Sequence, residues 1–347
     1  MTDTSLIQAI TRFHPRQGEW AVALRATLSA VVPLVVLFTT DHLDWALYAA
    51  FGAMSSLYGR NQALPGRLRM QLEAGASLLA AILIGVCVGI SPARDWLAIP
   101  AVAIFATVLA IIVHRRNWHP GGVILQVFAV GGVSSSVRTV SDFVPAAAVT
   151  IATIAFVLLL TLVTSSIARL WQRRSSHEPA PRPAPSAGAP EWPLHHYVIR
   201  YALAIAVAGT IATAIGIGHP YWAMVSVTVP LAAADAKGRS LRGIQRVIGT
   251  LLGVLVTWAV LSFDPSPVVL IIVIGIAQAG AEMFVGRNYG FALLFITPLA
   301  LCMVQLVHPI PVTQLIADRA IETVLGVAVG LAITLLTHER KQVGDTD

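Results

Sequence analysis

Three arginines share one face of a predicted helix in the second half of the chain. Arg239, Arg242 and Arg246 follow one another at spacings of three and four residues, which places side chains on the same side of a helix. Arg246 falls about one turn inside a long apolar run, where an unpaired charge is costly. A guanidinium group binds carboxylates through its fork of N–H donors. Arg242 and Arg246 are therefore expected either to bind small organic anions or to mark the cytoplasmic side of a membrane segment.

Two Arg–Asn pairs recur at equivalent places, 171 residues apart. Arg116-Asn117 and Arg287-Asn288 each precede an apolar run. We expect both pairs to lie at helix N-termini, where free backbone N–H groups and the helix dipole favour an anion. The alternative is that Asn only caps the helix and Arg only marks topology.

One charged cluster falls in the last apolar run of the chain. Asp318, Arg319 and Glu322 lie there, and Glu322 is expected to be the deepest acid. Burial favours the protonated form of a carboxyl group, so Glu322 is a candidate to accept a proton from outside and couple transport to proton entry. Alternatively, Arg319 and Glu322 neutralise each other as a local pair. Glu73 and Glu282 are weaker candidates, each expected to pair with a nearby arginine.

Two tryptophans, Trp45 and Trp222, are predicted to begin short helices at the outer face. Tryptophan is common at membrane interfaces, where its ring anchors a helix at the headgroup level. The alternative is that both rings stack against an aromatic cargo.

The elements that carry these residues are predicted to be membrane helices. The chain is 56% hydrophobic and 12% charged, about half the charge of a soluble domain. Apolar runs of about 20 residues can span a bilayer. We predict an all-α polytopic membrane protein of about twelve transmembrane helices, the second, fifth and eighth short or broken, at residues 20–40, 43–59, 70–90, 95–114, 121–137, 143–168, 195–217, 219–235, 244–263, 266–283, 289–307 and 313–337.

Lys and Arg set the predicted orientation. All but three of the 23 Lys and Arg residues fall on one side of this bundle, the exceptions being Arg94, Arg138 and Arg319. The positive side of a membrane protein is cytoplasmic, so both termini are expected inside a bacterial inner membrane. The net charge of +6 therefore indicates topology and contact with the lipid bilayer, and no nucleic-acid partner.

The chain is predicted to consist of two six-helix repeats of the same orientation. A Pro- and Ala-rich linker at 172–193 separates a repeat at 20–171 from one at 194–338, with a cytoplasmic segment at 1–19 and a tail at 339–347. Transporters built from repeats commonly bind cargo between them near the midplane, although duplicated helices can also simply pack together. Such a chain could act as a pseudo-twofold monomer or as a homo-oligomer. The Gly-x-x-x-Gly motifs at Gly85, Gly249 and Gly326 are expected to pack helices closely.

One segment resembles a known family. The run from His219 through Pro220, Tyr221 and Trp222 to Ala223, followed by Arg242 and by Arg246-x-x-Gly-Thr-x-x-Gly253, is similar to the fusaric acid resistance (FUSC) family of integral membrane transporters. The resemblance covers most of residues 20–337. The first half retains Trp45, Arg69 and Gly75, but has Leu72 and Ala76 at the places of Arg246 and Thr250.

The resemblance implies export of aromatic carboxylic acids and related toxic compounds. The larger bacterial exporters of this family carry a cytoplasmic domain after each bundle, where this chain has only the linker, so functions that need that domain are in doubt. The sequence has none of the motifs of nucleotide-binding enzymes, metalloproteases or serine hydrolases. We therefore expect no enzyme, no cofactor and no metal site, but a proton-coupled exporter of small organic anions. The alternatives are a passive anion channel or uniporter and a non-transporting scaffold.

Overall fold

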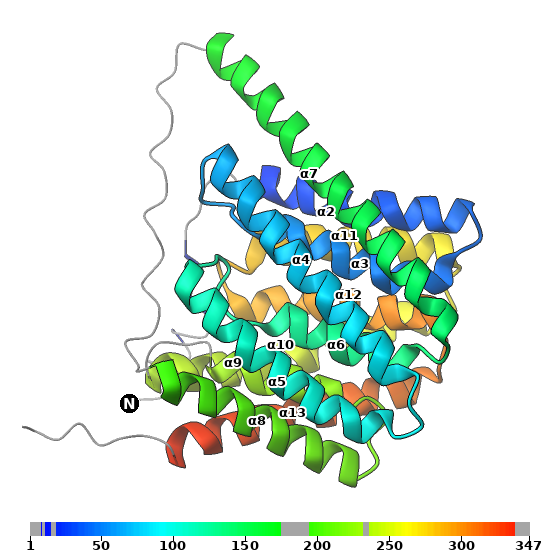
Figure 1. The fold of residues 1–347 in the computed structure, drawn as a ribbon, viewed down its shortest axis with the longest axis vertical. Helices are drawn as coiled ribbons and strands as arrows, with labels where there is room; N and C mark the ends of the chain where they lie inside the picture. Colours follow the sequence, from blue (N-terminus) through cyan, green and yellow to red (C-terminus); the bar gives the residue numbers. More distant parts are fainter. Residues whose placement is uncertain (1–7, 9–10, 15–18, 175–193, 232–235, 337–347) are drawn as a thin grey trace, which may run out of the picture.

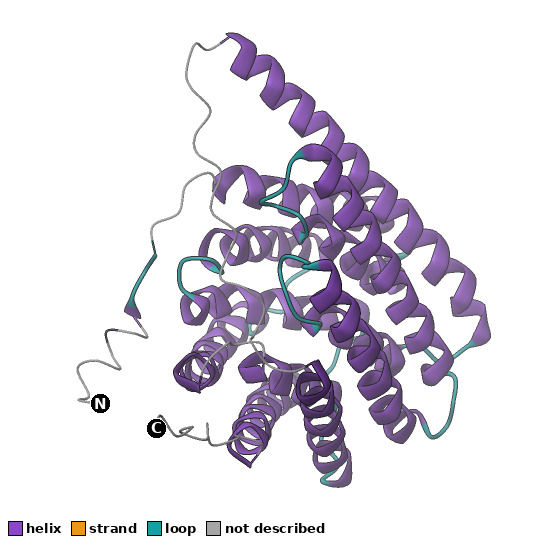
Figure 2. Cartoon of the chain, turned by 60° about the vertical axis from the view of Figure 1, so that its left-hand side comes forward, coloured by secondary structure: helices purple, strands orange, loops and turns teal. Residues whose placement is uncertain are grey.

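The computed structural model describes residues 8, 11–14, 19–174, 194–231 and 236–336. Every long element in this part of the chain is a helix, as Figure 2 shows, which confirms the predicted all-α class. The linker from residue 175 onward, most of the segment 1–19 and the tail 339–347 lie outside the described residues. The helices are α2 (Glu19–Thr39), α3 (Ala46–Ala53), α4 (Leu64–Gly89), α5 (Arg94–Arg116), α6 (Ile124–Ser136), α7 (Phe143–Arg174), α8 (Leu194–Ala214), α9 (Tyr221–Leu231), α10 (Ala236–Leu261), α11 (Pro267–Phe284), α12 (Tyr289–Val307) and α13 (Val312–Leu336).

Eight of the described helices are long and apolar enough to cross a membrane: α2, α4, α5, α7, α10, α11, α12 and α13. Their outward faces carry large apolar side chains, including Val36, Ile104, Leu159, Leu255 and Ile276. Apolar surface of this extent suits lipid rather than water. The chain is thus a multi-pass membrane protein, and the total of twelve spans stays a prediction.

Three predicted spans are short helices inside the bundle. Helices α3, α6 and α9 have 8, 13 and 11 residues, which is about 12, 20 and 17 Å at the rise of an α-helix. None reaches the roughly 30 Å of a hydrocarbon core. Every residue of α9 is buried, so longer helices surround it. The shortness predicted for the second, fifth and eighth segments is confirmed.

The two halves pack against each other through long helices (Figure 1). Helix α2 of the first half packs on α11, and α8 of the second half packs on α5. Within the halves, α4 contacts α6 and α7, and α10 contacts α12 and α13. Short 3-10 turns, η1 (Leu43–Trp45) and η2 (Met54–Leu57), flank α3, and η3 (Val140–Asp142) precedes α7. Helix α7 continues past the bundle to Arg174, and the rest of the predicted linker lies outside the described residues.

The three Gly-x-x-x-Gly motifs lie where helices approach closely. A Cβ at Gly85 would come within 2.8 Å of the Val133 side chain on α6, and one at Gly253 within 2.6 Å of the Leu293 carbonyl on α12. A Cβ at Gly326 would collide with the Ala223 carbonyl on α9. No larger residue fits without moving a helix, so the predicted packing role is confirmed.

Candidate functional site: a cavity between the two halves

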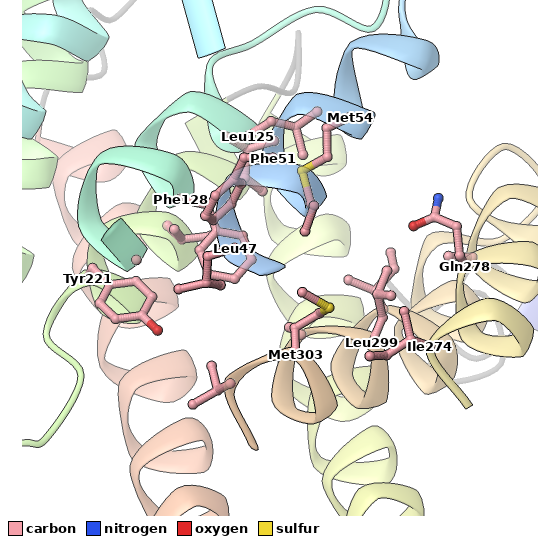
Figure 3. Close-up of a pocket in the computed structure, with 18 of the residues that line it drawn as sticks. Leu47, Phe51, Met54, Leu125, Phe128, Tyr221, Ile274, Gln278, Leu299 and Met303 are labelled. Atoms are coloured by element: carbon pink, nitrogen blue, oxygen red, sulfur yellow. The ribbon is translucent and has the colours of Figure 1, made fainter. Parts of the chain in front are cut away.

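A cavity of about 630 Å³ lies between the two halves of the chain. Both halves line it, with α2, α3 and α6 from the first and α9, α10, α11, α12 and α13 from the second. Its wall is mostly apolar. Figure 3 shows Leu47, Phe51 and Phe128 on one side, with Leu299 and Met303 on the other. This size and lining are typical of sites for small molecules.

Arg246 is a charged residue of the cavity wall. It lies on α10, is 2% exposed and lines the cavity. Its Nη1 donates to the Tyr289 hydroxyl at 3.1 Å and its Nη2 to the Ser226 hydroxyl at 3.5 Å. Among the described residues, its Nε has no hydrogen-bond partner. A buried guanidinium that the described part of the chain holds by hydroxyl groups, without an acidic partner, favours an anion.

Arg319 is the second buried arginine of the wall. It is 2% exposed, and within the described part of the chain neither its Nε nor its Nη1 has a hydrogen-bond partner. Its guanidinium lies 5.0 Å from the centre of the Trp222 ring, a cation–π distance. Trp222 is fully buried and therefore cannot anchor the protein at a membrane interface, so that interpretation is wrong for this residue. Trp45 is half-buried and stacks on His42 at 4.0 Å.

His219 and Asp318 meet at the start of α9. His219 Nδ1 lies 3.2 Å from Asp318 Oδ2, and the imidazole stacks on Trp222 at 4.6 Å. The Asp318 carboxylate can only accept a hydrogen bond, so the imidazole Nδ1–H is the donor.

Glu322 is a fully buried acid beside this group. The backbone of His219 lies close enough to act on its carboxyl group, and no described side chain forms a hydrogen bond with either carboxyl oxygen. Arg319 is close enough to act on it electrostatically, but the two side chains are not in hydrogen-bond contact. The structure thus gathers Asp318, Arg319 and Glu322 as predicted, without the direct Arg319–Glu322 pair.

The second Arg–Asn pair is a helix cap. Asn288 accepts a hydrogen bond from the Phe291 N–H at 2.9 Å at the start of α12, which is the expected capping geometry. Arg287 forms an ion pair with Glu19, so its charge is already partnered. The capping alternative is therefore confirmed for Asn288.

The first Arg–Asn pair lies at the opposite type of helix end. Arg116 is the last residue of α5, and Asn117 caps its C-terminus with a φ of 50°. The prediction of a helix N-terminus is wrong here, because His119-Pro120-Gly121-Gly122 intervene and α6 begins only at Ile124. Asparagine tolerates this left-handed conformation better than most residues. Arg116 instead pairs with Glu73 at 2.9 Å.

Two further predicted arginines lie outside the cavity. Arg69 is exposed and pairs with Glu73 at 3.0 Å, and Arg242 is exposed on α10. The side chain of Arg239 lies outside the described residues. Glu73 also accepts a hydrogen bond from Trp118 Nε1 at 3.0 Å. The expectation that Glu73 pairs with arginines is confirmed.

An ion pair joins the two halves at the end of the cavity that the sequence places on the cytoplasmic side. Arg60 Nη2 lies 3.1 Å from Glu282 Oε2, with both side chains largely buried. Glu282 thus also pairs with an arginine as expected. The partner of Glu282 is far away in sequence, and Arg60 and Tyr289 carry no motif that marks them as cavity residues, whereas His219 belongs to the family-like run of the sequence. In the sequence, the only indirect sign that Arg60 reaches the cavity is the short apolar segment of α3 that precedes it.

Among the described residues, no group of three His, Cys, Asp or Glu side chains is arranged to hold a metal ion.

Residues 204–333, from α8 to α13, match the family model described as fusaric acid resistance protein-like. A curated relative, the uncharacterized membrane protein YvaC of Bacillus subtilis strain 168, is 29% identical over 143 residues. That alignment covers 41% of this chain and only 23% of the relative, so the chain spans about a quarter of that protein. No solved structure matches the chain. The family resemblance predicted from the sequence is therefore confirmed, and it is carried by residues 204–333, which match the fusaric acid resistance protein-like family.

Proposed function

We propose that this chain is a secondary transporter of small organic anions and that the anion crosses through the cavity between the two halves. One observation carries the proposal: two buried guanidinium groups, those of Arg246 and Arg319, line an apolar cavity to which both halves contribute. An empty apolar space needs no positive charge for stability, and burying one is costly. An anion-binding site explains why both arginines are buried in this wall.

The walls of the cavity favour an anion with an apolar or aromatic body. Phe51, Phe128, Leu299 and Met303 offer flat and flexible apolar surfaces within the same space as the arginines. Aromatic rings pack well against such side chains. Aromatic carboxylic acids and related toxic compounds combine the two features, and the match to a fusaric acid resistance family supports export as the direction.

The packing of the helices supports two repeats related by a pseudo-twofold axis. The contact of α2 with α11 has its counterpart in the contact of α8 with α5, and that of α6 with α9 in that of α12 with α3. This exchange of equivalent helices supports an axis that runs between the halves, where the cavity lies. We propose repeats at 20–171 and 194–338, both termini in the cytoplasm, and a pathway complete within one chain of an inner membrane.

Glu322 is the proposed proton-coupling residue, with Asp318 and Arg319 beside it. A fully buried carboxyl without a hydrogen bond from any described side chain is suited to gain and lose a proton. A passive channel or uniporter would need the arginines and the cavity, but no titrating acid.

Reconstitution into liposomes tests the function. Flux of aromatic and dicarboxylic acids is followed with pH gradients of either polarity and without one. Movement of an anion against its own gradient, lost in Arg246→Gln and uncoupled from pH in Glu322→Gln, is the expected result. Only downhill flux, unaffected by Glu322→Gln, would indicate a channel, and absence of flux for every anion would refute transport of acids.

A further inference from the structure

The two buried arginines act on each other. The guanidinium groups of Arg246 and Arg319 are close enough to repel, and three of their nitrogens have no hydrogen-bond partner among the residues that the structure describes. Both side chains are at least nine-tenths buried and line the same cavity. Two like charges in a low-dielectric space need a negative charge between or beside them.

The acid available inside the protein is Glu322. Asp318 is already in contact with His219, and Glu282 is paired with Arg60. Glu322 lies one turn along α13 from Arg319, which acts on it electrostatically. The backbone of His219 lies close to its carboxyl group, and no described side chain forms a hydrogen bond with either carboxyl oxygen. Glu322 can therefore neutralise Arg319 when ionised, without being locked to it.

We infer that Arg246 and Arg319 together bind the negatively charged group of the substrate, and that Glu322 is an internal counter-ion which blocks this binding until it is protonated. The inference rests on the proposed function and assigns its anion site. When Glu322 is ionised, it neutralises the charge of Arg319, and its own negative charge repels the carboxylate of the substrate. With a proton on the Glu322 carboxylate, both guanidinium groups face the anion with their free donors.

Helices α8, α9 and α10 pack against α13, which carries Glu322. Asp318 and Arg319 share its helix, and His219 and Tyr221 come from the start of α9. Arg246 of α10 and Tyr289 of α12 act on Arg319, and α8 carries the buried side chains of Arg200 and Tyr201. Asp318 is in contact with His219. Glu322 is thus the group whose protonation changes the charge that the anion meets.

Proton binding and anion binding must then strengthen each other by the same factor, because the linkage is reciprocal. A proton and an anion that bind together also move together, so the anion would leave the cell with a proton and not in exchange for an entering one. Wild-type protein should bind an anion more tightly at mildly acidic than at mildly alkaline pH. Glu322→Gln should bind tightly at both pH values, since glutamine has no charge at either. Removal of the Arg319 charge should weaken binding about 10- to 100-fold, the typical effect of losing a hydrogen bond to a charged group.

The test is equilibrium binding of radiolabelled benzoate to the purified full-length protein in detergent at both pH values. Arg319→Gln alone would leave Glu322 buried without a counter-charge and could fail to fold, so Arg319→Gln is combined with Glu322→Gln. The single variant Glu322→Gln is the matched reference for this double variant. Arg115→Gln removes an exposed arginine at the end of α5 and controls for net charge.

The expected result is pH-dependent binding in wild type and Arg115→Gln, pH-independent binding in Glu322→Gln, and much weaker binding in the double variant. Equal affinity of Glu322→Gln and the double variant would overturn the role of Arg319 while leaving the proposed function intact. Equal affinity of the wild type at both pH values would overturn the counter-ion role of Glu322. Absence of benzoate binding in every variant, together with absence of flux in liposomes, would instead remove the proposed function.

Discussion

Removing the Glu282 carboxylate should destabilise the protein more than removing the Arg60 guanidinium that it binds. The ion pair is 3.1 Å long, and the side chains of Arg60 and Glu282 are 15% and 6% exposed. Glu282 also acts as counter-charge to Arg25, which is buried and has a free Nε. Glu282→Gln therefore leaves two arginines without a negative partner, whereas Arg60→Gln leaves Glu282 beside Arg25.

The size of the effect follows from burial. Removing one partner of a buried ion pair costs about 3–5 kcal/mol, the range that we expect for Glu282→Gln. For Arg60→Gln we expect about 1.5–3 kcal/mol, the value of a hydrogen bond to a charged group, because Arg25 still compensates Glu282. The double variant should lose less than the sum of the single losses, since each change removes the same contact.

The measurement is the free energy of unfolding in mixed detergent micelles for the wild type, both single variants and the double variant. Asp95→Asn is the control, because Arg94 and Asp95 are 3.9 Å apart and more exposed, and such pairs contribute about 0–1 kcal/mol. A larger loss in Arg60→Gln than in Glu282→Gln would refute the reasoning, as would strict additivity of the two.

Three further substitutions test the packing and the placement of charges. Gly326→Val should lower the free energy of unfolding by about 1–3 kcal/mol, because a side chain there collides with the backbone of α9. Gly121→Ala, a position with room for a side chain, should change it little, and a Gly326→Val variant as stable as the wild type would contradict the close approach of the helices. Glu73→Gln should cost about 1 kcal/mol or less, and less still in high salt, since the carboxylate is 27% exposed; a loss independent of salt would argue against an electrostatic origin. Arg242→Gln should leave the Kd for benzoate unchanged in a binding assay, because Arg242 is exposed outside the cavity; a large loss of affinity would place it in the anion site instead.

The sequence predicted the helices well because length and hydropathy are local properties. Each predicted segment coincides with a described helix, and the shortness of α3, α6 and α9 was visible as interrupted apolar runs. The first Arg–Asn pair was misplaced because a repeat in sequence does not guarantee a repeat in local structure. Pro120 and the two glycines after it delay α6, so Asn117 ends one helix while Asn288 begins another.

The candidate site was only partly predictable. Arg246 and Glu322 stood out because each is an ionisable residue within an apolar run. Their surroundings depend on which helices meet, and hydropathy does not encode that. The Arg60–Glu282 pair joins residues 222 positions apart. The position of Trp222 beneath Arg319 depends on the burial of all of α9, which a tryptophan at a helix start does not reveal.

Chemical labelling inside the cavity tests most directly whether anions pass through it. Leu299 lines the cavity, and Leu299→Cys can be introduced after both native cysteines, Cys87 and Cys302, have been replaced by serine. Labelling of Cys at this position with a small charged thiol reagent should block benzoate flux in liposomes, and benzoate should slow the labelling. Complete labelling with undiminished flux and no protection by benzoate would contradict a pathway between the two halves.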